Sequence, residues 1–164
     1  MAQLPHDQLK IGLMEIRPFH PADQPAAKAL ILAGLVEHWG WLDPTQNPDL
    51  DDIAASYADG LFLVAYEAER LVATGALVAT GALLPQGEKT GQIVRMSVDK
   101  GERRKGYGRV LLHALLQSAQ EMGYTQVVLE TTATWTEAIH FYEANGFHRT
   151  HEADGDIYFM RAIA

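Results

Sequence analysis

Residues 92–121 read QIVRMSVDKGERRKGYGRVLLHALLQSAQE, and this segment largely determines which fold the chain can adopt. Its first seven residues are mostly apolar or β-branched and predict a strand over 92–98. Leucines and alanines then recur at helical spacing, which predicts an amphipathic helix over 107–121 that stops at Gly123. A basic turn with two glycines, Gly106 and Gly108, lies between them. The chain therefore passes from a strand, through this turn, directly into a helix.

The turn between the predicted strand and helix has the chemistry of an anion-binding site. The first turn of a helix presents unpaired backbone N–H groups and the positive end of the helix dipole, which together bind phosphate. Gly106 and Gly108 let a pyrophosphate approach the backbone, and Arg103, Arg104 and Lys105 add positive charge. A solvated basic loop without a ligand is the alternative that charge alone leaves open.

Two other phosphate-binding motifs fit this turn poorly. A P-loop needs Gly-Lys-Ser/Thr after a four-residue spacer, and the sequence has no such run. A dinucleotide fingerprint needs a small residue where the chain has Leu111. Glu130 does fall at the spacing of a ribose ligand, but the hairpin strands before the turn do not fit a βαβ unit. A dinucleotide oxidoreductase stays as a separate hypothesis, which predicts binding of a nicotinamide cofactor.

The composition is that of an ordinary globular chain, with 48% hydrophobic and 21% charged residues among 164. We expect a single domain over residues 11–164, preceded by a loose segment at residues 1–10. The sequence contains no cysteine, no apolar run of the roughly 20 residues that span a bilayer, and no secretory signal pattern after Met1. A cytoplasmic protein without a membrane partner is therefore the expectation.

The charge of the chain is unevenly distributed. Its net charge of −8 argues against a nucleic-acid partner, which would need a basic face. Residues 95–109 nevertheless hold six basic and only two acidic residues. A local positive segment on an acidic protein suits a small polyanionic ligand better than a long polymer.

Periodicities elsewhere predict a mixed α+β (α/β) fold, with helices packed on a sheet. Thr134 and Glu137 form a capping-box pattern at the start of the last helix, and Gly75 and Gly81 indicate either bulges in one long strand or a close approach of another backbone. The strands expected besides 92–98 are 13–17, 61–66, 71–84, 127–131, 147–151 and 157–160. The helices expected besides 107–121 are 22–38, 49–57 and 134–144.

Two motifs resemble those of the GNAT superfamily of acetyl-CoA-dependent N-acetyltransferases. The segment VDKGERRKGYG at 98–108 is similar to the family's Arg/Gln-x-x-Gly-x-Gly/Ala motif, and AIHFYEANGF at 138–147 is similar to a second family block. The order of the predicted elements also matches, so the resemblance covers most of residues 13–162. It implies a central mixed, mostly antiparallel sheet of about seven strands flanked by about four helices, and acetyl-CoA as co-substrate.

The resemblance also implies roles for individual residues. Backbone amides around the basic turn would hold the pyrophosphate, and the pantetheine arm would pair with strand 92–98 where this strand parts from strand 127–131. Tyr142 would sit near the thioester sulfur and protonate the leaving thiolate; an ordinary aromatic of a helix face is its alternative. The cofactor-binding residues implied are Met96, Ser97, Val98, Arg103, Arg104, Lys105, Gly106, Tyr107, Gly108 and Arg109.

Trp135 is a departure from the family pattern. Many members carry an asparagine three residues before the alanine that matches Ala138, and this asparagine contacts the cofactor. The indole of Trp135 would either pack on the pantetheine arm, which makes it a cofactor-binding candidate, or serve only the core.

An amine acceptor must lose a proton before it attacks, because an alkylamine has a pKa of about 10. Some relatives use a glutamate on the strand before the cofactor loop, but residues 92–98 contain no carboxylate. Glu130, a lone charge in an apolar strand, is therefore the candidate base, and a strand-end residue that faces solvent is its alternative. Glu37 and His38 are further options. Trp39 and Trp41 would either wall the acceptor pocket or close the core. The histidines form no convincing metal set, and no metal is predicted.

The first functional hypothesis is acetyl transfer to a primary amine of a small molecule or protein, by direct attack in a ternary complex. The acidic remainder of the chain favours a small cationic acceptor over a protein. A noncatalytic acyl-CoA-binding sensor with the same fold is the alternative. A homodimer is possible, because dimers are common among similar proteins.

Overall fold

A single β-sheet forms the centre of the fold, and the helices pack against it. The computed structural model describes residues 9–11, 14–83 and 89–163, and within them lies an eight-stranded sheet in the order β1-β2-β3-β4-β5-β6-β8-β7. Neighbouring strands are antiparallel except β5 and β6, which are parallel. The strands are β1 (Leu9–Ile11), β2 (Met14–Pro18), β3 (Leu61–Glu67), β4 (Arg70–Leu83), β5 (Lys89–Val98), β6 (Gln126–Thr132), β7 (His148–Ala153) and β8 (Asp156–Ala162).

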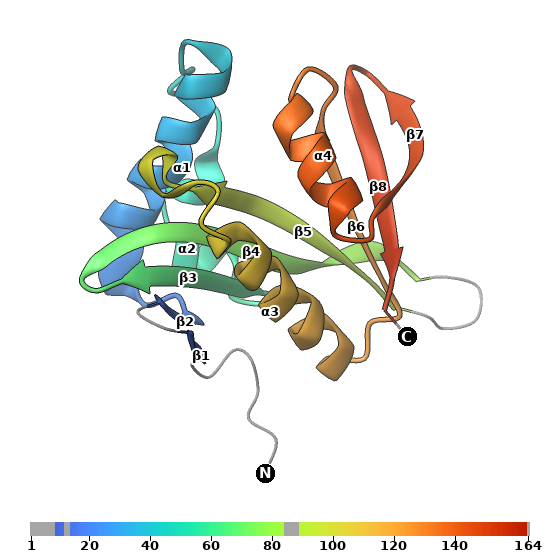
Figure 1. Ribbon diagram of the computed structural model, residues 1–164, viewed down its shortest axis with the longest axis horizontal. Helices are drawn as coiled ribbons and strands as arrows, with labels where there is room; N and C mark the ends of the chain where they lie inside the picture. The colour runs from blue at the N-terminus through green and yellow to red at the C-terminus, as the bar shows by residue number, and fades with distance from the viewer. Residues whose placement is uncertain (1–8, 12–13, 84–88, 164) are drawn as a thin grey trace.

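Helices cover both faces of this sheet. Residues of α3 and α4 share one core with one face of the strands, and residues of α1 and α2 share a second core with the opposite face. Figure 1 shows α1 and α2 near one end of the sheet and α4 beside β7 and β8 near the other. The α-helices are α1 (Gln24–Trp39), α2 (Ile53–Ser56), α3 (Tyr107–Glu121) and α4 (Thr136–Ala144), and the 3-10 helices are η1 (Pro21–Asp23), η2 (Pro48–Leu50) and η3 (Lys100–Glu102).

Strand β3 shows why helices cover both faces of the sheet. Its side chains alternate between the two cores: Phe62 and Val64 face α1 and α2, whereas Leu63 and Ala65 face α3. All four are buried, because a strand covered on both faces is apolar on both. The leucines of the predicted amphipathic helix are buried in the first core, and Leu111 and Leu115 are fully so.

The two parallel strands separate part of the way along their length. β5 and β6 pair only at Thr90–Gln126, Gly91–Val127 and Gln92–Val128. Beyond Gln92, β5 continues to Val98 paired only with β4 among the described residues. One edge of residues 93–98 pairs with β4, and the other edge therefore faces an opening between β5 and β6.

A bulge in β5 lies at this opening. β5 pairs Val94 with Ala76 and Ser97 with Thr74, so three steps along β5 match two along β4. Arg95 adopts a left-handed backbone conformation with φ 57°, which is typical of bulges and turns. The two register shifts lie where β4 carries Gly75 and Gly81, between Thr74 and Ala76 and between Ala79 and Leu83, but at Gly75 the extra residue belongs to β5 and not to β4 as predicted.

The fold class predicted from the sequence is confirmed, with small differences. All seven expected strands are present, and the short β1 adds an eighth, so strand pairing already begins at Leu9 within the segment expected to be loose; residues 1–8 lie outside the described part of the chain. The helix expected at 49–57 is instead split into η2 and the four-residue α2. Asp52 causes this break, because its side chain accepts a hydrogen bond from the Ala55 amide (3.1 Å) and starts a new helix.

The capping box predicted at Thr134 and Glu137 is wrong. α4 begins at Thr136, and its N-cap is Trp135, which has no side-chain oxygen to accept a hydrogen bond. The Thr134 hydroxyl instead lies 3.4 Å from Nε2 of His38, a residue of α1. A tertiary contact has therefore taken the side chain that the local pattern assigned to the helix end.

Candidate active site

The basic turn lies at the N-terminus of α3, as predicted. Gly106 is the N-cap residue with φ 88° and contributes no side-chain cap, so the first-turn N–H groups have no partner within the helix. Arg104 also has a left-handed backbone, with φ 67°. A Cβ atom added to Gly108 would lie 3.3 Å from Cγ2 of Val98 and 3.5 Å from Cζ of Phe141. The turn is thus shaped to expose backbone donors, which suits the binding of a pyrophosphate.

The three consecutive basic side chains of this turn have different surroundings. Arg103 pairs with Glu37 of α1 and donates from Nε to the Val98 carbonyl (3.3 Å), and Lys105 pairs with Glu102 (2.7 Å). Arg104 is 91% exposed, with only a 4.0 Å contact to Glu137. Arg104 is therefore the side chain of the three most available to a ligand.

Tyr107 and Arg109 occupy the first turn of α3. The Tyr107 hydroxyl donates a hydrogen bond to Glu67, the last residue of β3, and so ties the helix start to the β3–β4 hairpin. The Arg109 side chain is exposed. The contact of Tyr107 indicates that it positions the turn, a role that the sequence pattern did not reveal.

Met96, Ser97 and Val98 form the strand edge at the opening between β5 and β6. Ser97 pairs with Thr74 and Val98 with Ala73, both in β4, and this places one edge of β5 in the sheet. The other edge has no strand partner among the described residues. An extended chain could pair with it, as added strands do at exposed sheet edges.

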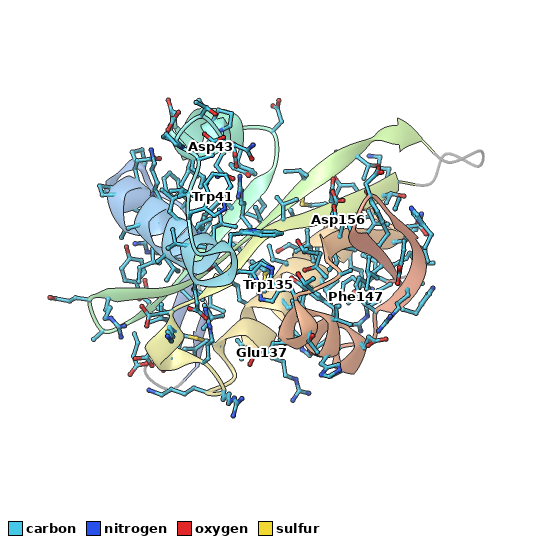
Figure 2. All side chains as sticks on the ribbon, turned by 90° about the horizontal axis from the view of Figure 1, so that it is seen from above. Trp41, Asp43, Trp135, Glu137, Phe147 and Asp156 are labelled. Atoms are coloured by element: carbon cyan, nitrogen blue, oxygen red, sulfur yellow. The ribbon has the colours of Figure 1, made fainter. Side chains whose placement is uncertain are left out.

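Trp135 lies at the start of α4 and contacts α1. Its ring stacks on that of His38, with centroids 4.4 Å apart and planes inclined by 11°. The neighbouring Glu37 contacts Arg103. The C-terminal end of α1 therefore contacts both the basic turn and the start of α4, and these three segments surround the mouth of the opening. Figure 2 shows Trp135 and Glu137 on the α4 side, across from Trp41 and Asp43.

Tyr142 is a buried tyrosine of α4. Its ring packs against Phe141, Phe147 and Phe159, and only 8% of the residue is exposed. Burial raises the pKa of the Tyr142 hydroxyl. No hydrogen bond of this hydroxyl to another described residue is found. A phenol that stays protonated and lacks a protein partner is able to act as a general acid.

A cavity of about 460 Å³ lies beside the bulge, on the side of α2. Glu130 of β6 lines it and is exposed, so the predicted base lies beside the opening while its side chain also reaches solvent, as the alternative expected. The carboxylate of Glu130 raises the pKa of its cross-strand neighbour Tyr158 through a hydrogen bond and its charge. The other lining residues are Asp49, Tyr57, Val78, Gln92, Ile93, Val94 and Arg95.

Asp49, Tyr57 and Arg95 are site residues that sequence reasoning missed. Arg95 donates from Nε and Nη2 to the two oxygens of Asp49 (3.0 and 2.6 Å), and the Tyr57 hydroxyl donates to Asp49 (2.6 Å). Burial alone would raise the pKa of Asp49, but these hydrogen bonds outweigh it and lower the pKa. Burial and the bond to Asp49 raise the pKa of Tyr57 to about 12. Asp49 lies 46 positions before Arg95 and Tyr57 lies 38 positions before it, so no local sequence pattern connects the three residues.

Trp39, the last residue of α1, and Trp41, two residues further on, do not close the core. Trp39 is 50% exposed and Trp41 is 67% exposed, which contradicts the core alternative. Neither lines the cavity beside the bulge. Glu37, one of the two further base options, already pairs with Arg103, and this hydrogen bond lowers the pKa of Glu37.

Neither a metal site nor a membrane span is found in the described part of the chain. No three histidine, aspartate or glutamate side chains there come together as metal ligands would. Over the same residues, every helix is too short or too polar to cross a membrane.

Comparison with known proteins places this geometry in a family. The profile described as "Acetyltransferase (GNAT) family" matches residues 28–147. Among solved structures, the fold is similar to that of a GNAT-family acetyltransferase from Staphylococcus aureus Mu50, with a TM-score of 0.81 and 21% identity over 92% of this chain and 99% of that one. It is also similar to the PaiA N-acetyltransferase of Thermoplasma acidophilum, solved in complex with coenzyme A, with a TM-score of 0.76 and 18% identity over 91% and 98% of the two chains.

A curated relative has higher sequence identity over a shorter alignment. The probable N-acetyltransferase family 8 member 5 of Mus musculus is 39% identical over 105 residues, which is 62% of this chain and 45% of that protein. The chain spans about half the length of the curated relatives it matches.

Proposed function

Because the chain belongs to the acetyltransferase (GNAT) family, we propose that it is an acetyl-CoA-dependent N-acetyltransferase that acts by direct attack in a ternary complex. The observation that carries the proposal is the geometry of β5: its free edge at 96–98 leads directly into a basic helix N-terminus. The coenzyme A complex of the structurally similar PaiA N-acetyltransferase supports the same cofactor. We take residues 11–164 as one N-acetyltransferase domain.

The cofactor fits the residues present. Amides of residues 104–109 would hold the pyrophosphate, helped by the exposed Arg104, because a helix N-terminus favours anions. The edge at Met96, Ser97 and Val98 would pair with the pantetheine arm, and Trp135 would pack over this arm from the α4 side. Arg103, Lys105 and Tyr107 would shape the turn through their contacts with Glu37, Glu102 and Glu67.

Two side chains would carry the protons of the reaction. Acetyl-CoA, when bound, supplies the activated acetyl group as a thioester. Glu130 would take a proton from the amine as its nitrogen forms the new C–N bond, and Tyr142 would give its proton to the sulfur as the C–S bond breaks. The raised pKa of Tyr142 keeps its proton in place until a thiolate is formed. One proton is taken and one is given, so the transfer is balanced.

The acceptor we propose is a small cationic amine. The cavity beside the bulge has room for a small molecule. Arg95 neutralises the carboxylate of Asp49, which leaves the carboxylate of Glu130 to attract a cation. A protein amine is the less favoured acceptor, and nucleic acid and membrane partners are not proposed. The absence of cysteine fits a cytoplasmic protein, which we propose together with a homodimer as the assembly to test.

Isothermal titration with acetyl-CoA and with NADH tests the cofactor. We expect wild-type protein to bind acetyl-CoA and not NADH, and Arg104→Glu to weaken acetyl-CoA binding about tenfold, because it reverses an exposed charge beside the turn. Arg149→Glu is the matched control, since it reverses an arginine of β7 away from the opening, and it should bind normally.

Each result separates the hypotheses. Failure of well-folded wild-type protein to bind acetyl-CoA would overturn the proposed function, and binding of NADH would favour an oxidoreductase. If acetyl-CoA binds, thiol release is then followed with a panel of primary amines. Tight binding without release for any amine would favour the sensor.

A further inference from the structure

Two clusters of the same composition occur in this protein, each with an arginine, an aspartate and a tyrosine. The bulge cluster consists of Arg95, Asp49 and Tyr57, and the β2 cluster of Arg17, Asp23 and Tyr66. In each, the arginine binds both oxygens of the carboxylate, and the tyrosine hydroxyl donates to one of them. Only the bulge cluster lines the cavity and belongs to β5.

The bulge cluster joins two segments distant in sequence. Arg95 lies at the bulge of β5, and Asp49 lies in η2. Their side chains are 19% and 29% exposed, so the pair is largely screened from water. Nη2 of Arg95 also donates to Oδ1 of Asn47 (3.1 Å). A half-buried, bidentate pair of this kind is stronger than an exposed ion pair.

The backbone of the bulge is held from the β4 side as well. The Thr74 hydroxyl, fully buried, donates to the carbonyl oxygen of Arg95 (2.8 Å). A Cβ atom on Gly75 would lie only 2.6 Å from Sδ of Met96, so Met96 occupies the space that the glycine leaves open. The bulge is therefore fixed by β4 on one side and by the Arg95 side chain on the other.

The η2 segment is itself anchored to α1. Gln24, the first residue of α1, donates from Nε2 to the Leu50 carbonyl (2.6 Å) and accepts from the Ile53 amide at Oε1 (3.0 Å). Asp49 is thus an anchored partner and not the end of a free loop. Through Arg95, it can transmit the position of α1 and η2 to the strand edge that starts at the next residue, Met96.

We infer that Arg95 is a positioning residue, which Asp49 and Tyr57 hold so that the bulge presents the 96–98 edge in the register that the pantetheine arm needs. A slip of one residue in a strand turns its side chains and hydrogen-bonding groups to the opposite side. The inference rests on the proposed function, because it assumes that this edge binds acetyl-CoA. The cluster would thus contribute to cofactor binding without contacting the basic turn, by holding the strand edge in register.

The test compares acetyl-CoA binding by Asp49→Asn, Arg95→Gly and the control Asp23→Asn, without acceptor. Glycine tolerates a positive φ, so Arg95→Gly removes the tether without adding backbone strain. We expect the dissociation constant of acetyl-CoA to rise about tenfold in Asp49→Asn and in Arg95→Gly. In Asp23→Asn it should stay as in the wild type, although this control loses the equivalent carboxylate and with it thermal stability. Calorimetry is done well below the melting temperature of each variant.

A second ligand distinguishes positioning from general loosening. Adenosine 3′-phosphate 5′-diphosphate, the nucleotide half of coenzyme A, lacks the pantetheine arm, and its affinity should be the same in Asp49→Asn as in the wild type. Equal losses of affinity for both ligands, or normal acetyl-CoA binding in Asp49→Asn and Arg95→Gly, would overturn the inference while the proposed function stands. Absence of acetyl-CoA binding in the wild type would instead remove the proposed function itself.

Discussion

At the scale of single residues, the protonation of Tyr142 links burial to chemistry. An α4 tyrosine among three phenylalanine rings could serve packing alone. Its hydroxyl, however, has no hydrogen-bond partner among the described residues, and burial raises its pKa. Packing accounts for the ring but not for the hydroxyl, because a tyrosine that serves packing usually hydrogen-bonds through its O–H.

Replacement of Tyr142 by phenylalanine tests its role as the acid. We expect Tyr142→Phe to lower kcat on the order of 100-fold, as general acids contribute in this range. The dissociation constant of acetyl-CoA and the melting temperature should stay nearly constant, because the ring remains in place. Steady-state kinetics and calorimetry measure these quantities.

Tyr124→Phe is the matched control for this variant, because Tyr124 is a partly buried tyrosine that packs on the same core and lies outside the proposed site. It should leave kcat unchanged. Full activity of Tyr142→Phe would show that another group protonates the thiolate.

At the scale of elements, the two ends of α3 resemble each other in backbone but differ in function. Gly106 precedes the helix and Gly123 follows it, both with φ 88° and both with open space around an added Cβ. Each allows the chain to adopt a left-handed conformation at a helix end. Only the N-terminal end exposes unpaired N–H groups, so only Gly106 is expected to affect binding of an anion.

The variants Gly106→Ala and Gly123→Ala separate backbone strain from ligand binding. Each should lower the free energy of unfolding by about 1 kcal/mol, because alanine is strained at positive φ. Gly106→Ala should also weaken acetyl-CoA binding, since a relaxed turn misaligns the amides that receive the pyrophosphate. Denaturant unfolding and titration calorimetry check both expectations. A similar loss of affinity in both variants would mean that the helix as a whole, and not its N-terminus, determines binding.

At the scale of the whole molecule, buried carboxylates couple the fold to pH. Asp23 is 3% exposed and accepts hydrogen bonds from Arg17 (2.8 and 2.9 Å), Tyr66 (2.5 Å) and the His20 amide (2.8 Å). Burial alone would raise the pKa of Asp23, but these bonds outweigh it and lower the pKa from 3.8 to about 2. This cluster joins β2 and β3 to η1, so its loss weakens the fold at this junction.

The stability of the protein should therefore fall in acid. Because the pKa of Asp23 is lower in the folded state, its contribution is fully present above about pH 4 and is lost as the pH falls toward 2. The contribution corresponds to about 2 kcal/mol. Urea unfolding between pH 6 and 2 measures it in wild type and in Asp23→Asn, and the variant should show the shallower loss. Asp51→Asn, which removes an exposed partner of Lys28, is the control and should follow the wild type. Parallel curves for all three proteins would contradict the assignment to Asp23.

The amino-acid sequence by itself determined the order and type of the elements and the location of the basic turn. The helix predicted at 107–121 has these bounds in the structure, since its leucine stripe and the flanking glycines are local signals. The seven strands were predictable for the same reason, because alternation and turn residues are read within a few positions. It was harder to predict which of two possible partners a polar side chain would bind, as the helix break at Asp52 and the unused capping box at Thr134 show.

Tertiary structure alone decided which of these residues meet. The pairing of Arg95 with Asp49, the stacking of His38 on Trp135 and the contact of Arg103 with Glu37 join residues between 46 and 97 positions apart. Such contacts depend on how the helices lie across the sheet, and the hydrophobic periodicity of the sequence does not indicate this arrangement. The bulge was indicated only by Gly75, whereas the residue that forms it, Arg95, lies on the opposite strand. The sequence thus specifies the basic turn through local backbone chemistry, and the sheet brings the residues of the cavity beside the bulge together.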